Sequence, residues 1–387
     1  MLDKPNKILL VGNGFDLAHK LFTRYSDVLD MFKNWKKFYE SYKNRNLDND
    51  YIKKIAGNTI NSLDSFDTEN LEKLDQIIKN NSWIDYYMHC GAEIDLWIDF
   101  EREIIPVLNL FDCIFKSEIN LSQRSIKVSG YNYMRFEGRF SKYFTIMNDK
   151  IFISEEYANP AYGLMKKKIL RDLKSEFLEF IEAVEIYFYE FVEKDFRVHK
   201  IEQIRNIEPD YIINFNYTHT EKYYGFRNDR VHHIHGFIRD NLKCGSNNMV
   251  LGVNGYENKD FIYFVKYFQR IQKHCGVDYK NFVNEPCIFK TEDGVDKEYN
   301  DFELYIYGHS LDETDNDILK YVIGDFDEFN EFQLKPRKVT IYYCNQEDFE
   351  AKVINLITLY GRDVVEKCMD NNRIVFIKTE SNTIEKS

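Results

Sequence analysis

"KILLVGNGFDLAH", residues 7–19, gives the strongest indication of the fold in this sequence. A short apolar run leads into Gly12 and Gly14, which one polar residue separates, and Asp16 follows close behind. Apolar runs of this length are typical of buried strands, and glycine permits the tight turn after which a helix can begin at once. The stretch therefore predicts a strand, a sharp turn and a helix that starts near Phe15.

Six further runs share the character of this first strand, being short, apolar and bounded by Gly, Asn or charged residues. They are YIINF (211–215), VHHIHG (231–236), NMVLGV (248–253), ELYIYG (303–308), KVTIYYC (338–344) and NRIVFIK (372–378). Helical patterns follow the runs at 303–308 and 338–344. Alternation of strand and helix predicts an α/β protein with one mainly parallel, doubly wound, Rossmann-like sheet.

The middle of the chain has a different, helical pattern. It is clearest at 163–193, where seven apolar residues recur at steps of three and four and so share one helical face, as expected of core positions. They are Leu170, Leu173, Phe177, Phe180, Val184, Phe188 and Phe191. A second helix, in AEIDLWIDFEREIIPVL, is predicted to end near Pro106. The weakly periodic stretch 116–159 is interpreted as loops or a lid.

These patterns predict two regions. Residues 1–24 and 206–387 are expected to form the α/β core, and 25–205 a mainly helical insertion or lid after the first strand. The insertion could serve as a pocket lid, an oligomer interface or a sensing surface.

Composition excludes several classes of protein. The net charge is −12 without a basic stripe, so electrostatic repulsion disfavours a nucleic-acid partner. No apolar run is long enough to cross a membrane, and the seven cysteines are scattered without a C-x-x-C pair. We expect a cytoplasmic protein with neither a disulfide framework nor a zinc ribbon.

Ligands of open α/β sheets bind outside the carboxyl ends of the strands, which is where the turn at Gly12 is predicted to lie. Gly12 and Gly14 would let the backbone approach a phosphate, and the following helix would direct its N–H groups at an anion. The dinucleotide fingerprint needs a third glycine, and Leu17 occupies that position. Asp16 could cap the helix or bind a ribose hydroxyl.

Three more polar turns follow predicted strands. Asn216 comes after 211–215 and would position a water, while His235 ends 231–236 and would act as a general base. The turn after 303–308 offers donors for phosphate. His233 shares a strand face with His235, but no carboxylate stands at ligand spacing, so we expect no metal. The candidate nucleotide contacts are Gly12, Asn13, Gly14, Phe15, Thr218, Gly308, His309 and Ser310.

The motifs "LLVGNGFDLAHKLFTRYSDVL", "WIDFE", "FNYTHTEKYYG", "HIHG" and "YGHSLDETD" together resemble the AbiH family of bacterial abortive-infection proteins. Their order and spacing run from about residue 8 to residue 315. The sequence departs from the family pattern at Lys20 and Phe22, where the family usually has Gly and Pro. The resemblance implies a role in defence against phage, with a phage-derived trigger as a partner.

More distantly, the same order of motifs is similar to sirtuin-like domains, which act on the nicotinamide–ribose bond of NAD. This resemblance implies NAD as substrate or ligand, with Asn216 orienting the ribose or the attacking water and His235 as the catalytic histidine. Asp16 is our own third candidate, as a carboxylate that stabilises developing positive charge. Sirtuin deacetylases carry a four-cysteine zinc module, which this sequence lacks, so a deacetylase is not expected.

Two functions remain open at this point. In the first, the protein is an NAD glycohydrolase that depletes the cofactor in infected cells. In the second, it binds NAD or a related nucleotide without turnover and serves as a sensor or assembly module that acts through a partner effector. The protein could form a homo-oligomer in either case. A dehydrogenase is disfavoured by the missing third glycine.

Overall fold

The computed structural model of the chain describes residues 5–46, 63–89, 97–127, 131–194, 200–284, 287–290, 296–299, 302–327 and 331–379. The chain forms two compact units. Unit 1 comprises Met1–Leu21, Val198–Phe237 and His274–Ser387, and unit 2 comprises Phe22–Arg197 and Ile238–Lys273. Residues 238–273, which the sequence analysis assigned to the α/β core, belong to unit 2.

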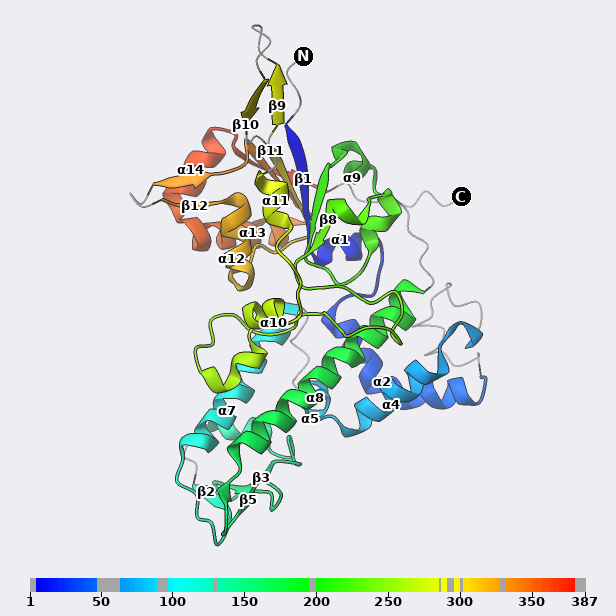
Figure 1. Cartoon of the computed structure of the whole chain (residues 1–387), viewed down its shortest axis with the longest axis vertical. Helices are drawn as coiled ribbons and strands as arrows, with labels where there is room; N and C mark the ends of the chain where they lie inside the picture. Colours follow the sequence, from blue (N-terminus) through cyan, green and yellow to red (C-terminus); the bar gives the residue numbers. More distant parts are fainter. Residues whose placement is uncertain are drawn as a thin grey trace. The chain divides into compact units, whose positions relative to one another are not determined.

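Unit 1 is built on a six-stranded sheet in which every neighbouring pair is parallel (Figure 1). The strand order is β15-β14-β11-β1-β7-β8. Six of the seven predicted strands are thereby confirmed, together with the mixed α/β class. The strands are β1 (Asn6–Val11), β7 (Tyr211–Asn214), β8 (Val231–His233), β11 (Phe302–Tyr307), β14 (Lys338–Tyr343) and β15 (Ile374–Lys378).

The prediction of a strand at 248–253 is wrong. The only ladder contact of this segment among the described residues is an isolated bridge from Val253 to Val265, and the segment lies in unit 2. Its apolar side chains are buried, but the side chain of Gln269 bonds the backbone instead of a neighbouring strand, accepting from Leu251 N at 3.2 Å and donating to Leu251 O at 2.6 Å. Apolar content alone does not distinguish a buried loop from a strand.

β1 is the strand at which the order of the sheet reverses. It pairs with β11 on one side, Leu10 opposite Ile306, and with β7 on the other, Leu10 opposite Ile213. Counted along the chain, the sheet reads 3-2-1-4-5-6. Because all six strands are parallel, their carboxyl ends lie at one edge, and the turns after β1 and β11 are neighbours there.

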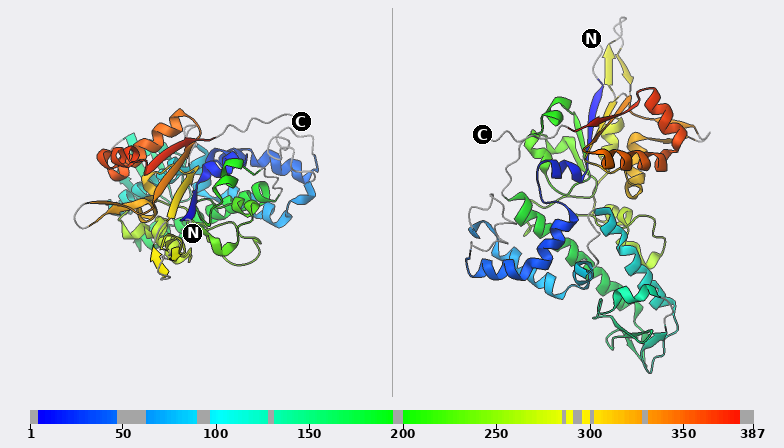
Figure 2. Two further views of the ribbon diagram at one scale, coloured as in Figure 1. Left: turned by 90° about the horizontal axis from the view of Figure 1, so that it is seen from above. Right: turned by 180° about the vertical axis from the view of Figure 1, so that it is seen from behind.

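Both faces of the sheet are covered by helices, as a parallel sheet requires (Figure 1 and Figure 2). Successive side chains of β1 point to opposite faces of the sheet and so contribute to two different apolar clusters. Ile8 and Leu10 belong to a large apolar cluster with α12 (Asn316–Ile323), α13 (Gln346–Tyr360) and α14 (Arg362–Asp370). Leu9 and Val11 join a smaller cluster with α1 (Asn13–Ala18) and α9 (Glu202–Ile207).

Unit 2 is mainly helical. The helix predicted at 163–193 is confirmed as α8 (Lys166–Tyr187) continued by a π-helical segment, Phe188–Glu193, and Leu173, Phe177 and Phe180 of the predicted stripe are buried. The other main helices are α2 (Tyr25–Lys43), α4 (Thr68–Asn80), α5 (Ser82–His89), α6 (Trp97–Arg102), α7 (Ile104–Lys116) and α10 (Lys266–Gln272).

The helix predicted to end near Pro106 ends earlier, at Arg102, and a second helix, α7, begins at Ile104 and continues through Pro106 to Lys116. The helical pattern divides at Glu103, and Pro106 lies in the first turn of α7. Proline is tolerated there because the N–H groups of the first turn have no intrahelical acceptor.

The segment 116–159, interpreted from sequence as loops or a lid, contains a small antiparallel sheet of order β2-β4-β3. These strands are β2 (Ser125–Lys127), β3 (Phe144–Met147) and β4 (Lys150–Ile153), and their buried side chains include Ile126, Phe144 and Ile151. Runs of three or four residues are too short to show a clear alternation in the sequence.

The remaining elements are short and connect the main ones. In unit 2 they are η1 (Leu63–Ser65), η2 (Tyr131–Phe136), β5 (Ala158–Asn159), β6 (Gly163–Leu164) and η6 (Lys259–Phe264). In unit 1 they are η4 (Thr220–Tyr224), η5 (Asn228–Arg230), α11 (Tyr279–Asn284), β9 (Cys287–Lys290), β10 (Asp296–Tyr299), η7 (Glu313–Asp315), β12 (Gly324–Phe326) and β13 (Phe332–Leu334). None of the helices in the described part of the chain is both long and apolar enough to span a membrane.

Candidate functional site

The four polar turns that the sequence singled out lie together at the carboxyl edge of the sheet of unit 1. They follow β1, β7, β8 and β11, and side chains from one turn bond to the next. Asn216 donates its amide to the carbonyl of Gly12 at 3.0 Å, and this bond joins the turns after β7 and β1. We call this group of four turns the edge site.

Glycines bring the turns after β1 and β11 into direct contact. Gly14 N donates to Gly308 O at 2.8 Å, and a Cβ on Gly14 would lie only 2.6 Å from Gly308 Cα. A Cβ on Gly308, whose φ is +69°, would lie 2.2 Å from the backbone nitrogen of Phe15. The glycines of the first motif therefore allow two backbones to meet at the point where the strand order reverses.

Phe15, one of the predicted nucleotide contacts, has its side chain fully buried in the apolar cluster under α1. Its ring packs edge-on against Tyr307 at a centroid distance of 6.2 Å. Ser310, another predicted contact, is exposed, and its carbonyl accepts a bond from Asn355 at 2.9 Å.

Asp16 is buried and lies in the first turn of α1, whose N-cap residue is Gly12. Its two carboxylate oxygens accept hydrogen bonds from the hydroxyls of Thr218 at 2.5 Å and Thr220 at 2.7 Å. Two hydroxyl donors stabilise the charged carboxylate in a place from which most water is excluded. The segment after β7 thus holds Asp16, the acid at the start of the helix that follows β1.

A second buried acid, Glu221, stands beside His233. Glu221 Oε2 accepts from the amide of Asn214 at 3.0 Å, and Oε1 lies 3.4 Å from His233 Nε2. Burial raises the pKa of Glu221, but the bond to His233 and the charges of His233 and His219 outweigh it, so the net pKa is below its usual value. His233 Nδ1 faces the carbonyl of Asn216 at 3.0 Å. Both ring nitrogens of His233 therefore face acceptors, which suits the doubly protonated ring.

His235, the predicted general base, lies against a third acid, Asp315. His235 Nε2 is 3.0 Å from Asp315 Oδ1, and Nε2 of His309 is 3.6 Å from Asp315 Oδ2. The ring of Phe215 packs against both imidazoles, with centroid distances of 5.6 Å and 4.3 Å. His235, His309 and Asp315 are all largely buried. One carboxylate thus joins two of the predicted histidines.

Sequence reasoning did not assign Asp315 or Glu221. Both stand inside quoted motifs, Asp315 as the last residue of "YGHSLDETD" and Glu221 within "FNYTHTEKYYG". The available signal was their position, because each acid belongs to a turn that follows a strand of the same sheet. What the sequence could not indicate is which histidine each acid faces.

The third histidine of the run, His232, has different neighbours. Its Nδ1 is 3.7 Å from Asp278, and its ring lies 5.5 Å from that of Tyr279. Burial lowers the pKa of His232 to about 4, so the ring is neutral at physiological pH. In the described part of the chain, no group of three or more His, Cys, Asp or Glu side chains has the arrangement of a metal site.

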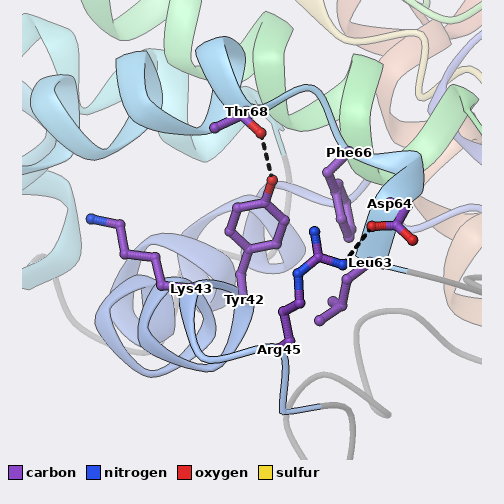
Figure 3. Close-up of a pocket in the computed structure, with 7 residues that line it drawn as sticks. All are labelled: Tyr42, Lys43, Arg45, Leu63, Asp64, Phe66 and Thr68. Carbon is purple, nitrogen blue, oxygen red and sulfur yellow. Dashed lines mark hydrogen bonds and ion pairs between the residues drawn. The ribbon is translucent and has the colours of Figure 1, made fainter.

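A separate pocket of about 250 Å³ lies in unit 2 (Figure 3). Tyr42 bonds Thr68 across it at 2.8 Å, and Arg45 pairs with Asp64 at 2.8 Å. Its lining contains no histidine and none of the predicted site residues. The residues are Tyr42, Lys43, Arg45, Leu63, Asp64, Phe66 and Thr68.

Comparison with known protein families gives a match over most of the chain. A family model described as "Bacteriophage abortive infection AbiH" matches residues 8–334, a span that includes all four turns of the edge site. No curated protein and no solved structure matches the chain. Because the matched span covers most of the chain, the protein belongs to the bacteriophage abortive infection AbiH family.

Proposed function

We propose that this protein acts in abortive infection by hydrolysing NAD at the nicotinamide–ribose bond, which depletes the cofactor in infected cells. The observation that carries the proposal is the pair of His235 and Asp315, held at 3.0 Å at the carboxyl edge of a parallel sheet. A histidine oriented by a carboxylate is a recurrent general base.

The strand order supports a nucleotide as the substrate. The order 3-2-1-4-5-6 is that of dinucleotide-binding sheets, whose ligands lie at the crevice where the order reverses. In this chain that point lies between β1 and β11, at the turns that contain Gly12 and Gly308. The resemblance of the motifs to sirtuin-like domains favours NAD among the nucleotides.

The proposed reaction converts NAD and water into ADP-ribose, nicotinamide and a proton. The bond between the ribose C1′ and the pyridinium nitrogen breaks, and its electron pair leaves with the neutral nicotinamide. A water oxygen forms the new bond to C1′, and the water proton passes to the imidazole of His235, which later releases it to solvent. A positioned base of this kind contributes about 10²–10⁴-fold to a rate.

Two other predicted residues have supporting roles in this proposal. Asn216 holds the turn at Gly12 through its 3.0 Å bond to the carbonyl, so it positions the backbone that faces the substrate. Asp16, which is bonded to two threonine hydroxyls, supplies a fixed negative charge opposite the cationic ribose of the transition state.

The test is nicotinamide release from NAD by the purified full chain, together with cellular NAD during phage infection. We compare the wild type with His235→Gln, which keeps a donor for Asp315, and with His274→Gln, a control at an exposed position of unit 1. We expect NAD to fall in infected cells that express the wild type or His274→Gln, and to persist with His235→Gln. Unchanged NAD during a protective wild-type response would refute hydrolysis.

A second candidate is a nucleotide-binding sensor without turnover. It is favoured by the burial of the edge-site side chains, since Asp16 and Thr218 are each only 1% exposed and bond to one another. It predicts that NAD binds to the wild type, measured by calorimetry, that no nicotinamide is released, and that protection continues without loss of NAD.

A further inference from the structure

The turn after β11 contains an acid whose position is unusual for the start of a helix. Asp315 is the N-cap residue of α12, where an aspartate ordinarily accepts a bond from a backbone N–H of the first turn. Its side chain makes no such bond. The carboxylate instead faces the imidazoles of His235 and His309.

The proton of His309 can be placed from its contacts. The backbone N–H of Leu311 donates to His309 Nδ1 at 2.9 Å, so this nitrogen carries a lone pair and no hydrogen. A neutral imidazole has one N–H, which must then be on Nε2. That atom faces Asp315 Oδ2, so His309 directs an N–H at the carboxylate.

The hydrogen of His235 is placed by its contact with Asp315. An ionised carboxylate has only acceptors, so the 3.0 Å contact between His235 Nε2 and Asp315 Oδ1 requires a hydrogen on Nε2. The basic nitrogen of the neutral ring is then Nδ1. When a histidine is paired with a carboxylate, the hydrogen bond made by one ring nitrogen decides which of the two neutral tautomers the ring adopts.

We propose that Asp315 is the positioning residue of the edge site, which holds His235 in the Nε2–H form so that Nδ1 is the atom that receives the proton. His309 is the second donor to the same carboxylate and fixes its orientation. The role of Nδ1 as the proton acceptor in catalysis rests on the proposed NAD hydrolysis, whereas the form of the ring can be measured without any substrate.

The direct test is nuclear magnetic resonance of the full chain labelled with ¹⁵N-histidine, in which the imidazole signals show which nitrogen carries the hydrogen. His235→Gln identifies the signals of His235 among the nine histidines. In the wild type, at a pH raised until the spectrum shows the neutral form of the ring, we expect hydrogen on Nε2 and a lone pair on Nδ1. A wild-type spectrum with the hydrogen on Nδ1 would overturn the proposal.

Two variants test the role of the carboxylate. Asp315→Ala removes the acceptor, and we expect the signals of His235 to shift toward a mixture of the two neutral forms. Asp312→Asn is the matched control, because Asp312 stands in the same turn, caps it by accepting from Thr314 N at 2.9 Å, and can be replaced there by asparagine. It should leave the His235 signals unchanged. Identical spectra for Asp315→Ala and the wild type would contradict the proposal, and if Asp315→Ala fails to fold, the wild-type spectrum still decides.

Kinetics separate this inference from the function on which it rests. We expect Asp315→Ala to lower kcat for nicotinamide release on the order of 10²–10⁴-fold while KM for NAD changes little. If the wild type releases no nicotinamide but shows the Nε2–H form of His235, the proposed hydrolysis fails and the positioning role of Asp315 stands. Turnover by Asp315→Ala at the wild-type rate would overturn its role in catalysis.

Discussion

Gly308→Ala is expected to destabilise unit 1 strongly. The backbone of Gly308 has φ of +69°, and its added Cβ would lie 2.2 Å from Phe15 N and 2.4 Å from Gly14 C, whereas ordinary contacts are 3.4–4 Å. A side chain at positive φ costs roughly 1–2 kcal/mol, and overpacking adds about 1–3 kcal/mol. Because the obstructing atoms belong to the backbone, no side-chain rotation can relieve the contact. Gly308→Ala is therefore expected to lower the free energy of unfolding by about 2–5 kcal/mol.

Gly225→Ala separates the two contributions to this loss. Gly225 has φ of +80°, but a Cβ there would meet nothing within 4 Å. Gly225→Ala should lose only the stability that positive φ costs, so the free energies of unfolding of the two variants should differ by about 1–3 kcal/mol.

The assay must report on unit 1, and all three tryptophans, Trp35, Trp83 and Trp97, belong to unit 2. Hydrogen exchange of peptides that cover β1 and β11 reads the opening of the sheet directly. Faster exchange in Gly308→Ala than in Gly225→Ala would support a close contact between the turns after β1 and β11. Equal exchange in the two variants would refute it, because the turns could then separate at no cost.

The remaining predictions concern buried charge. Because burial lowers the pKa of His232 to about 4, below that of the unfolded chain, the stability that this ring contributes is present above about pH 6.5 and falls as the pH decreases toward 4. Between pH 7 and pH 5 the wild type should lose about 2 kcal/mol more than His232→Asn in urea unfolding, and equal losses would contradict this. In unit 2, Lys266 and Glu101 form a buried ion pair at 2.8 Å, and Lys266→Met would leave the carboxylate buried without its cation. This variant should lower the free energy of unfolding, followed by tryptophan fluorescence, by about 3–5 kcal/mol. The exposed pair of Lys166 and Asp260 is the control, and Lys166→Met should cost under about 1 kcal/mol; similar losses would show that burial is not decisive.

Local pattern was sufficient for most of the fold. The strand, turn and helix at residues 7–19 are visible because apolar runs and glycines constrain the chain over a few residues. The same holds for α8, whose apolar stripe repeats over many turns. The prediction of a strand at 248–253 failed because the apolar side chains of this segment are buried although it joins no sheet among the described residues. Its backbone bonds the side chain of Gln269 instead. Prediction also failed where the strands were too short to show a pattern, as in β2, β3 and β4.

Polar residues stand at the ends of several apolar runs in the sequence, and a parallel sheet places the ends of its strands at one edge. Asn216, His235 and His309 could therefore be proposed as neighbours from chain position alone. Their partners, in contrast, are set by the folded chain: Asn216 holds the carbonyl of Gly12, and Asp315 joins the two histidines. His235 and Asp315 are 80 residues apart, and their meeting depends on the strand order and on the start of α12. The choice of partner is a long-range property of the folded chain, which no local pattern encodes.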